Sequence, residues 1–216
     1  MQEKPGSDMP FVSTPLQVSG EILGVFLSNL ETQVDYTSIF TKRLIAIIFL
    51  GEKNMRAKIE TSQGTIEVEL FETETPKTVN NFVELARAGF YTNLVFHRIV
   101  RGFVIQTGDP KTKDGSGNKS QWGTGGSEKT IPLETVSSLR HSEGTLGVAR
   151  SQDPNSGSSQ FFINLGNNSG LDGHYTVFGR VTSGMDVVNK IAGVSVDPHD
   201  APKNPTEAML NSITVL

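Results

Sequence analysis

Residues 96–109 constrain the fold of this 216-residue chain more than any other stretch. They are Phe-His-Arg-Ile-Val-Arg-Gly-Phe-Val-Ile-Gln-Thr-Gly-Asp, and they predict two short strands that meet in a tight bend at Arg101-Gly102. Glycine supplies the backbone freedom that such a bend needs. Many further short strand-like runs, punctuated by the chain's 22 glycines, favour an all-β sandwich or barrel with few helices.

The side chains of this stretch combine apolar groups with a positive charge. Because side chains alternate across a strand, we expect Phe96, Arg98 and Val100 on one face. The alternation alone leaves two interpretations open: Arg98 faces solvent, or its guanidinium forms a site with Phe103 and Gln106. A plain core strand does not carry this combination of a guanidinium, a large aromatic ring and an amide.

Local patterns predict two helices and several more strands. Thr75-Pro76 predicts the start of a helix, with Thr at the N-cap and Pro at the first helical position, and Gly89 ends it. The apolar spacing over 185–192 predicts a second helix. Strands are predicted at 57–61, 65–71, 144–149, 159–165, 176–181 and 211–216.

Residues 1–55 differ in composition from the rest of the chain and are expected to form an N-terminal extension. The first fifteen are polar and proline-rich, which predicts disorder, and the apolar spacing over 22–30 predicts a short amphipathic helix. The apolar run 44–50 is too short to span a bilayer, so no firm membrane association is expected. Three interpretations of the run stay open: it docks on the following domain, it attaches weakly to a membrane surface or partner, or the mature protein starts at Met55.

Composition and residue spacing argue against several classes of function. The net charge of −4 implies no general attraction to nucleic acid, and the absence of cysteine excludes a thiol nucleophile and a disulfide scaffold. The four histidines lie far apart without a zinc-binding spacing, and there is no Gly-x-Ser-x-Gly elbow. The glycine-rich loop 110–130 lacks the P-loop pattern, so we expect its backbone to approach a peptide ligand instead of a nucleotide.

Five long motifs occur in one order along the second part of the chain. They are residues 96–109, Gly-Thr-Gly-Gly at 123–126, Gly-Thr-Leu-Gly-Val-Ala-Arg at 144–150, Ser-Gln-Phe-Phe-Ile-Asn-Leu at 159–165 and Leu-Asp-Gly-His-Tyr-Thr-Val-Phe-Gly-Arg-Val at 171–181. In these motifs and their spacing, residues 56–216 resemble the cyclophilin family of peptidyl-prolyl isomerases. The Val-Ala-Arg-Ser sequence and Tyr175 look more like the bacterial or archaeal members.

The resemblance implies a fold, an activity and a class of partner. The implied fold is mainly β: a closed eight-stranded antiparallel β-barrel over residues 56–216, capped by two α-helices. The implied activity is cis-trans isomerisation of X-Pro bonds in unfolded or flexible proline-containing polypeptides, with neither cofactor nor metal. A cytoplasmic monomer is expected.

Isomerisation of an X-Pro bond breaks no covalent bond, but resonance is lost at the twisted state, which gives a barrier of roughly 18–20 kcal/mol. In that state the prolyl nitrogen regains a lone pair and accepts a hydrogen bond, which the planar amide nitrogen cannot do. A donor aimed at this nitrogen therefore binds the transition state better than the ground state. Arginine suits the task because it stays protonated and offers several fixed donors.

By the same resemblance, Arg98 is the catalytic donor, and Gln106 holds the substrate carbonyl or orients Arg98. The backbone of Ala149 and Arg150 pairs with the peptide, and His97 is a structural neighbour of the site. The residues expected to bind substrate are Phe103, Val104, Gln106, Gly123, Ala149, Arg150, Gln160, Phe162, Leu171 and Tyr175.

Four positions depart from the best-known eukaryotic members of the family. Val104 replaces the usual methionine, Arg150 replaces an asparagine, and Tyr175 replaces a histidine at the pocket rim. Gly170 replaces a tryptophan that contacts cyclosporin. We therefore expect cyclosporin to bind weakly, with an affinity weaker than nanomolar, and the isomerase activity to be retained.

The alternative function belongs to a different class, a non-catalytic chaperone or scaffold that binds proline peptides. Relatives without catalysis are expected to lose Arg98, Phe103 or Gln106, and all three are present here. The sequence therefore favours the isomerase.

Overall fold

The structure is a computed structural model that describes residues 55–216, so the predictions for 1–54 lie outside the described residues. Its centre is one nine-stranded antiparallel sheet with the strand order β3-β9-β1-β2-β8-β6-β7-β5-β4. The strands are β1 (Arg56–Thr61), β2 (Gly64–Leu70), β3 (Leu94–Val95), β4 (Arg98–Val100), β5 (Val104–Thr107), β6 (Thr145–Val148), β7 (Phe161–Asn164), β8 (Val177–Ser183) and β9 (Met209–Val215).

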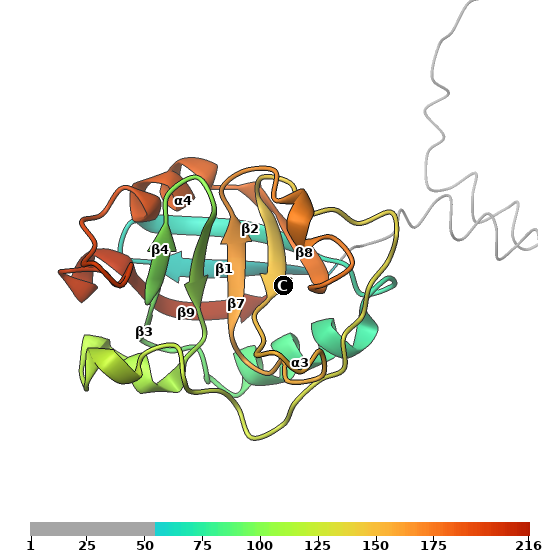
Figure 1. The fold of residues 1–216 in the computed structure, drawn as a ribbon, viewed down its shortest axis with the longest axis horizontal. Helices are drawn as coiled ribbons and strands as arrows, with labels where there is room; N and C mark the ends of the chain where they lie inside the picture. Colours follow the sequence, from blue (N-terminus) through green and yellow to red (C-terminus); the bar gives the residue numbers. More distant parts are fainter. Residues whose placement is uncertain (1–54) are drawn as a thin grey trace, which may run out of the picture. The chain divides into compact units, whose positions relative to one another are not determined.

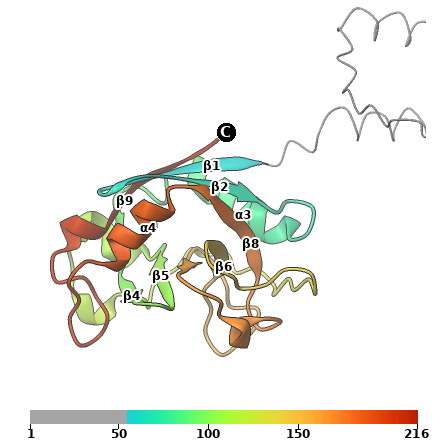
Figure 2. The same ribbon diagram turned by 90° about the horizontal axis from the view of Figure 1, so that it is seen from above.

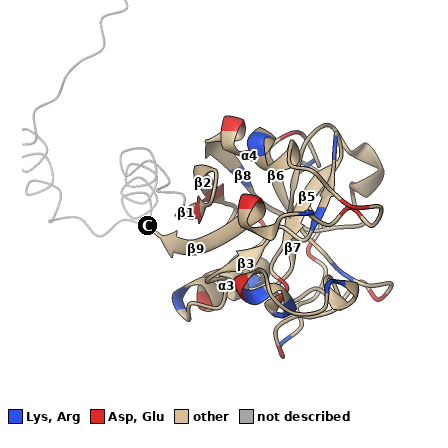
Figure 3. Ribbon diagram, turned by 90° about the vertical axis from the view of Figure 1, so that its left-hand side faces the viewer, with Lys and Arg blue, Asp and Glu red and all other residues tan. Residues whose placement is uncertain are grey.

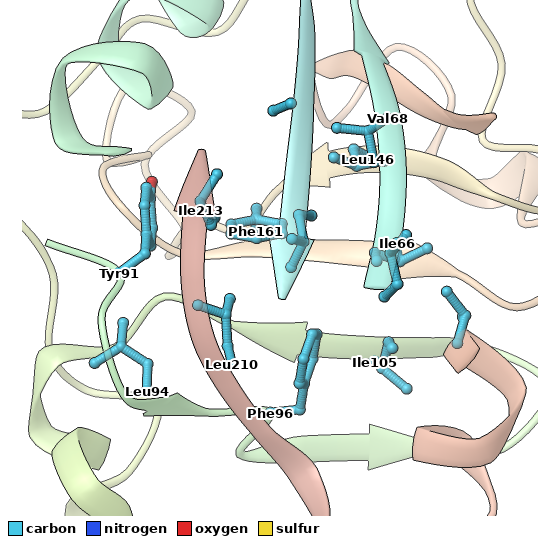
Figure 4. Packing of buried hydrophobic residues seen from close by; sticks show 14 of the residues in the cluster. Ile66, Val68, Tyr91, Leu94, Phe96, Ile105, Leu146, Phe161, Leu210 and Ile213 are labelled. Atoms are coloured by element: carbon cyan, nitrogen blue, oxygen red, sulfur yellow. The ribbon is translucent and has the colours of Figure 1, made fainter. Parts of the chain in front are cut away.

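The sheet curls strongly, so that β1, β2 and β9 cross behind β4 and β7 at a steep angle (Figure 1). The view from above separates β1 and β2 from β4, β5 and β6 (Figure 2). Buried side chains from both parts fill the interior, among them Phe96, Ile105, Phe161 and Leu210 (Figure 4). Strands β1 and β2 alternate between buried and less buried positions, as strands with one inward face do, whereas every residue of β6 and β7 is buried.

The prediction of a closed eight-stranded barrel is wrong, because the sheet is open and has nine strands. Its two end strands, β3 and β4, follow one another in the chain but do not pair. Loops satisfy their free edges instead: the Ile99 amide donates to the Asp200 carbonyl at 2.8 Å, and the Val95 amide donates to Thr112 Oγ1 at 3.1 Å. A sheet edge satisfied by its own loops needs no further strand.

The predicted hairpin at the start of the domain is confirmed. Ala57 pairs with Val68 and Ile59 pairs with Ile66, and all four side chains are fully buried. The last strand is longer than the predicted 211–216, because it starts at Met209 and pairs with both β1 and β3.

The two predicted helices are α3 (Pro76–Arg87) and α4 (Met185–Ala192), which lie at opposite ends of the curled sheet (Figure 1). Thr75 occupies the N-cap position of α3, but its side chain does not cap the helix, since its hydroxyl donates to the Phe71 carbonyl at 3.1 Å. The Glu134 carboxylate supplies the cap by accepting from the amides of Lys77 at 3.2 Å and Thr78 at 2.8 Å. A distant carboxylate thereby neutralises the unpaired amides of the first turn.

Both helices contain acidic and basic residues (Figure 3). On α4, Lys190 and Asp186 form an exposed ion pair of 3.1 Å, and on α3 Glu84 pairs with Lys129 at 3.3 Å. Within residues 55–216 we find no helix long and apolar enough to cross a bilayer.

The expected face of Phe96 is also wrong. Phe96 is fully buried in the core together with Ile99, whereas Arg98 and Val100 are only half-buried. Strand β4 begins at Arg98, so the alternation does not extend back to Phe96. The phenyl ring of Phe96 points into the core (Figure 4), whereas Arg98 is only partly buried.

Candidate active site

The β4–β5 hairpin forms one wall of the candidate active site. Its register places Arg98 directly opposite Gln106, and the bend carries Gly102 at a φ of 73°. Such a positive φ suits glycine and strains other residues. Arg101 in the bend donates to the last carbonyls of α4, at 3.3 Å to Ala192 and 3.0 Å to Gly193, so the bend is tied to that helix.

Strands β7 and β6 lie beside this hairpin and form the floor of the groove. Gln106 of β5 pairs with Phe162 of β7, and Phe162 in turn pairs with Gly147 of β6. The Ala149 amide donates to the Gln160 carbonyl at 2.9 Å and continues this pairing beyond the end of β6. Segments far apart in the sequence are thus brought to one surface.

All eleven predicted site residues lie together along one groove. The central pocket has a volume of about 160 Å³, and the adjoining hollow, of about 380 Å³, shares Gln106, Ala149 and Arg150 with it. Gly123 and Gln160 line the adjoining hollow. The pocket is lined by Arg98, Phe103, Val104, Gln106, Ala149, Arg150, Phe162, Leu171 and Tyr175.

The pocket combines an apolar floor with a free cation. Val104 and Phe162 are 2% and 5% exposed, so little of either side chain is available to water. The Arg98 guanidinium carbon lies 5.8 Å from the centre of the Phe103 ring. No group in residues 55–216 accepts a hydrogen bond from this guanidinium or forms an ion pair with it, so its donors are available to a ligand.

Two glutamine side chains form a chain of hydrogen bonds beside Arg98. Gln106 Nε2 donates to Gln160 Oε1 at 2.8 Å, and Gln160 Nε2 donates to the Gly123 carbonyl at 3.0 Å and to that of Gly125 at 2.5 Å. Because these bonds occupy Nε2 of Gln106, its amide orientation is defined. Its Oε1 atom is left to accept a hydrogen bond from a substrate or from Arg98.

The glycine-rich loop is held against the groove by Asp109, which sequence reasoning did not identify. The Asp109 side chain is fully buried and accepts hydrogen bonds from the amides of Lys111 at 2.8 Å, Gly123 at 2.6 Å and Gly125 at 3.1 Å. The signal in the sequence was Asp109-Pro110, a typical start of an Asx turn. Two 3-10 turns, Pro110–Gly115 and Lys119–Gln121, replace the expected irregular loop.

The opposite wall carries Arg150, whose guanidinium donates mainly to carbonyls of the protein itself. Its Nε and Nη2 atoms donate to the His174 carbonyl at 2.9 and 2.8 Å, and Nη1 donates to the Ser151 carbonyl at 2.8 Å. Its carbon lies 4.5 Å from the centre of the Tyr175 ring, within the range of a cation–π contact. Arg150 therefore holds the rim of the pocket together.

His97 lies directly before Arg98 and is buried, with 4% of its surface exposed. Burial lowers the pKa of its imidazole to about 4, so the ring is neutral near pH 7. Neither ring nitrogen finds a hydrogen-bond partner among the described residues. A neutral, enclosed ring agrees with the expectation of a structural neighbour.

The curled sheet and the half-apolar groove define a β-protein with one guanidinium that is free among the described residues. The family model described as cyclophilin type peptidyl-prolyl cis-trans isomerase/CLD matches residues 56–214. The chain therefore belongs to the cyclophilin-type peptidyl-prolyl cis-trans isomerase family.

Two curated relatives illustrate the similarity. Peptidyl-prolyl cis-trans isomerase-like 2 of Rhizopus delemar is 42% identical over 184 residues, which are 84% of this chain and 32% of that protein. Peptidyl-prolyl cis-trans isomerase-like 1 of Emericella nidulans is 42% identical over 144 residues, which are 66% of this chain and 85% of that protein. The chain thus spans about a third of the first relative's length.

A solved structure gives the same result. The crystal structure of a Cryptosporidium parvum cyclophilin-type isomerase in the presence of the dipeptide Ala-Pro is 30% identical with a TM-score of 0.67, covering 74% of this chain and 98% of that one. These relatives are eukaryotic, so the predicted resemblance to a bacterial or archaeal branch is not confirmed.

Proposed function

We propose that this chain is a peptidyl-prolyl cis-trans isomerase that accelerates rotation about X-Pro bonds in flexible protein segments. The observation that carries the proposal is the Arg98 guanidinium, which stands unpaired at an apolar pocket of about 160 Å³. The half-buried guanidinium has N–H groups without a partner among the described residues, which suits a ligand that supplies the acceptor.

The pocket suggests how the substrate binds. The proline ring enters between Phe103, Phe162 and Leu171, which leaves the X-Pro amide beside Arg98. The Arg150 amide and the Ala149 carbonyl have no hydrogen-bond partner within residues 55–216, so they are available to the peptide backbone. Gln106 Oε1 is available on the opposite side. These contacts hold the segments that flank the rotating bond.

In the proposed mechanism, the acyl group twists out of the plane of the amide while the proline ring stays in its pocket. As resonance is lost, the prolyl nitrogen becomes pyramidal and accepts a hydrogen bond from Arg98. An acceleration of about 10^4- to 10^5-fold requires roughly 6–7 kcal/mol. A charged hydrogen bond contributes about 1.5–3 kcal/mol, so positioning of the flanking segments must supply the remainder.

The proposal is tested by protease-coupled isomerisation of a short Ala-Pro-Phe peptide. We expect residues 55–216 and the full chain to accelerate the cis-to-trans step, which is otherwise a matter of tens to hundreds of seconds. Binding of the peptide without acceleration would contradict the proposal and establish the non-catalytic chaperone or scaffold in its place. Absence of both binding and acceleration would reject both functions.

The prediction of weak cyclosporin binding belongs to the same proposal. Gly170 lies in a 3-10 turn (Ser169–Leu171) beside the pocket, and no atom lies within 4 Å of the position a Cβ would take. The rim therefore offers no indole, and it has open space for one. We expect Gly170→Trp to tighten cyclosporin binding at least tenfold in a calorimetric titration, equivalent to about 1.4 kcal/mol. Nanomolar binding by the unmodified chain would contradict the prediction.

The monomeric state, the cytoplasmic location, the bacterial-like branch and the boundary at residue 55 stay predictions. Sedimentation of the full chain tests the first. The Val-Ala-Arg-Ser sequence and Tyr175 alone support the branch.

A further inference from the structure

A buried polar cluster lies behind the proline pocket, with His141 at its centre. The His141 side chain is 2% exposed and does not line the pocket itself. Its imidazole stacks on the Phe162 ring, with centres 5.7 Å apart and planes at 25°, and meets the Tyr175 ring edge-on at 6.4 Å. Two aromatic residues of the pocket therefore rest against one imidazole.

The hydrogen bonds of the cluster define the tautomer of His141. Asn164 Nδ2 donates to Thr145 Oγ1 at 2.9 Å and to the Thr145 carbonyl at 3.1 Å, and it lies 3.2 Å from His141 Nδ1. Asn164 Oδ1 accepts from Asn168 Nδ2 at 2.7 Å. His141 Nε2 lies 3.2 Å from the Tyr175 carbonyl, which can only accept, so the imidazole proton resides on Nε2 and Nδ1 faces the Asn164 amide as an acceptor.

The same cluster reaches the β4–β5 hairpin. Asn168 Nδ2 donates to the Phe103 carbonyl at 2.9 Å as well as to Asn164. The Phe103 carbonyl is also held by the Leu165 amide at 2.8 Å. Phe103, Phe162 and Tyr175, which come from three separate segments, are thus joined through the buried His141 and Asn164 and the partly buried Asn168.

We propose that His141, as the neutral Nε2–H tautomer, is a positioning residue that sets the geometry of the proline pocket through Phe162 and Tyr175, with Asn164 and Asn168 extending its influence to Phe103. The inference rests on the proposed isomerase activity. His141 touches neither the proline nor the X-Pro amide and acts only through the residues that do. Such a role matters because a displacement of about 1 Å in a catalytic site costs on the order of a hundredfold in rate.

The charges around His141 support the neutral form. Burial lowers the pKa of the imidazole, opposed by the bond to the Tyr175 carbonyl and by the Asp172 carboxylate. Asp172 accepts from the His141 amide at 2.8 Å and faces Arg140 at 3.6 Å, which offsets its charge, and Arg150 covers the outer side of Tyr175. Protonation would place a second N–H on Nδ1, directed at the Asn164 amide, and would break that bond.

The first measurement is the tautomer and titration of wild-type His141, from long-range ¹⁵N spectra of the imidazole. We expect the Nε2–H form, with a pKa below that of an ordinary histidine. An Nδ1–H form, or an ordinary histidine titration, would overturn the proposal. This measurement needs no variant and stands even where a substitution prevents folding.

The second measurement uses His141→Phe, which keeps a ring stacked on Phe162 and removes both hydrogen bonds. Exchange spectroscopy on an Ala-Pro peptide gives kcat and Kd from pH 4 to pH 7 without a coupling protease. We expect kcat to fall about tenfold and Kd to change less than threefold. The Phe162 ring still forms the floor of the pocket, but its position is no longer fixed. In wild type, kcat is expected to fall at low pH as His141 becomes protonated. In His141→Phe, the part of this fall that comes from protonation of His141 is expected to be absent.

The control is Ile59→Val, a core substitution in β1 with an expected cost of about 1 kcal/mol in stability, at a residue that does not line the pocket. We expect its kcat to match wild type. A kcat of His141→Phe within twofold of wild type, or an acid limb unchanged by the substitution, would overturn the positioning role. If wild type itself lacks activity on the peptide, the proposed isomerase function fails, whereas a loss confined to His141→Phe supports the inference.

Discussion

Two arginines face the same pocket from opposite walls, each near an aromatic ring, and they differ in their hydrogen bonds. On one wall, Arg150 donates to the carbonyls of His174 and Ser151 and stacks on Tyr175. On the other wall, Arg98 has no such partner within the described residues and lies 5.8 Å from the Phe103 ring. A guanidinium whose donors mostly meet the protein's own carbonyls has few left for a ligand. The free guanidinium is the one that is able to meet a transition state.

The largest effect is expected for Arg98→Lys. Lysine keeps the positive charge but cannot present two fixed N–H groups at the distance of arginine, so the bond to the twisted amide is lost. We expect kcat/KM for an Ala-Pro peptide to fall about a hundredfold, or about 2.7 kcal/mol. Arg180→Lys, on β8 and paired with Glu69 at 2.9 Å, is the matched control and should stay within twofold of wild type. A value for Arg98→Lys within threefold would place the catalytic donor elsewhere.

A smaller effect is expected for Gly147→Ala, which disturbs the floor between the two walls. An added Cβ would collide with the Phe162 ring and come within 3.0 Å of His141 Cε1. We expect kcat/KM to fall about tenfold and the free energy of unfolding to fall by about 1–3 kcal/mol because of overpacking. Gly170→Ala is the control, since no atom lies within 4 Å of its Cβ position. Wild-type kinetics in a folded Gly147→Ala protein would show that the ring position does not limit the rate.

Arg150→Met should have a weaker effect, which sharpens the contrast between the arginines. The substitution removes the bonds to the His174 and Ser151 carbonyls, so the rim around Tyr175 loosens while Arg98 stays in place. We expect peptide affinity to fall about threefold with kcat unchanged, because rim contacts act on ground state and transition state alike. A large loss of kcat, measured by exchange spectroscopy, would give Arg150 a direct part in catalysis.

No effect on small peptides is expected from deletion of residues 1–54. All residues assigned to the groove lie within 98–175, and the family model starts at residue 56. The kcat/KM of the truncated chain should equal that of the full chain, and its unfolding midpoint should be unchanged. A collapse of soluble expression or of turnover would show that the N-terminal segment belongs to the fold.

Local patterns predicted local structure well. The first hairpin and the helix at 185–192 follow from alternation and apolar spacing, because their hydrogen bonds close between neighbours in sequence. The family resemblance, and not periodicity, brought the groove residues together, and the structure places all eleven along it.

Features that depend on distant partners were missed. The Glu134 cap lies 56 residues from the Thr78 amide that it binds, and Asp109 reaches the glycine loop from 14 residues away. Closure of the sheet was predicted wrongly for the same reason. Whether β3 and β4 pair depends on Thr112 and Asp200, which belong to loops that no strand pattern describes.

The most direct test of the account compares Arg98→Ala and Arg150→Ala by exchange spectroscopy on one Ala-Pro peptide, which yields kcat and Kd for each. The account predicts that Arg98→Ala still binds the peptide, within about fivefold of wild type, but loses at least a hundredfold in kcat, whereas Arg150→Ala keeps kcat and loses only affinity. Equal losses of kcat in the two variants, or a fully active Arg98→Ala protein with its fold intact, would contradict the assignment of Arg98 as the donor to the twisted amide.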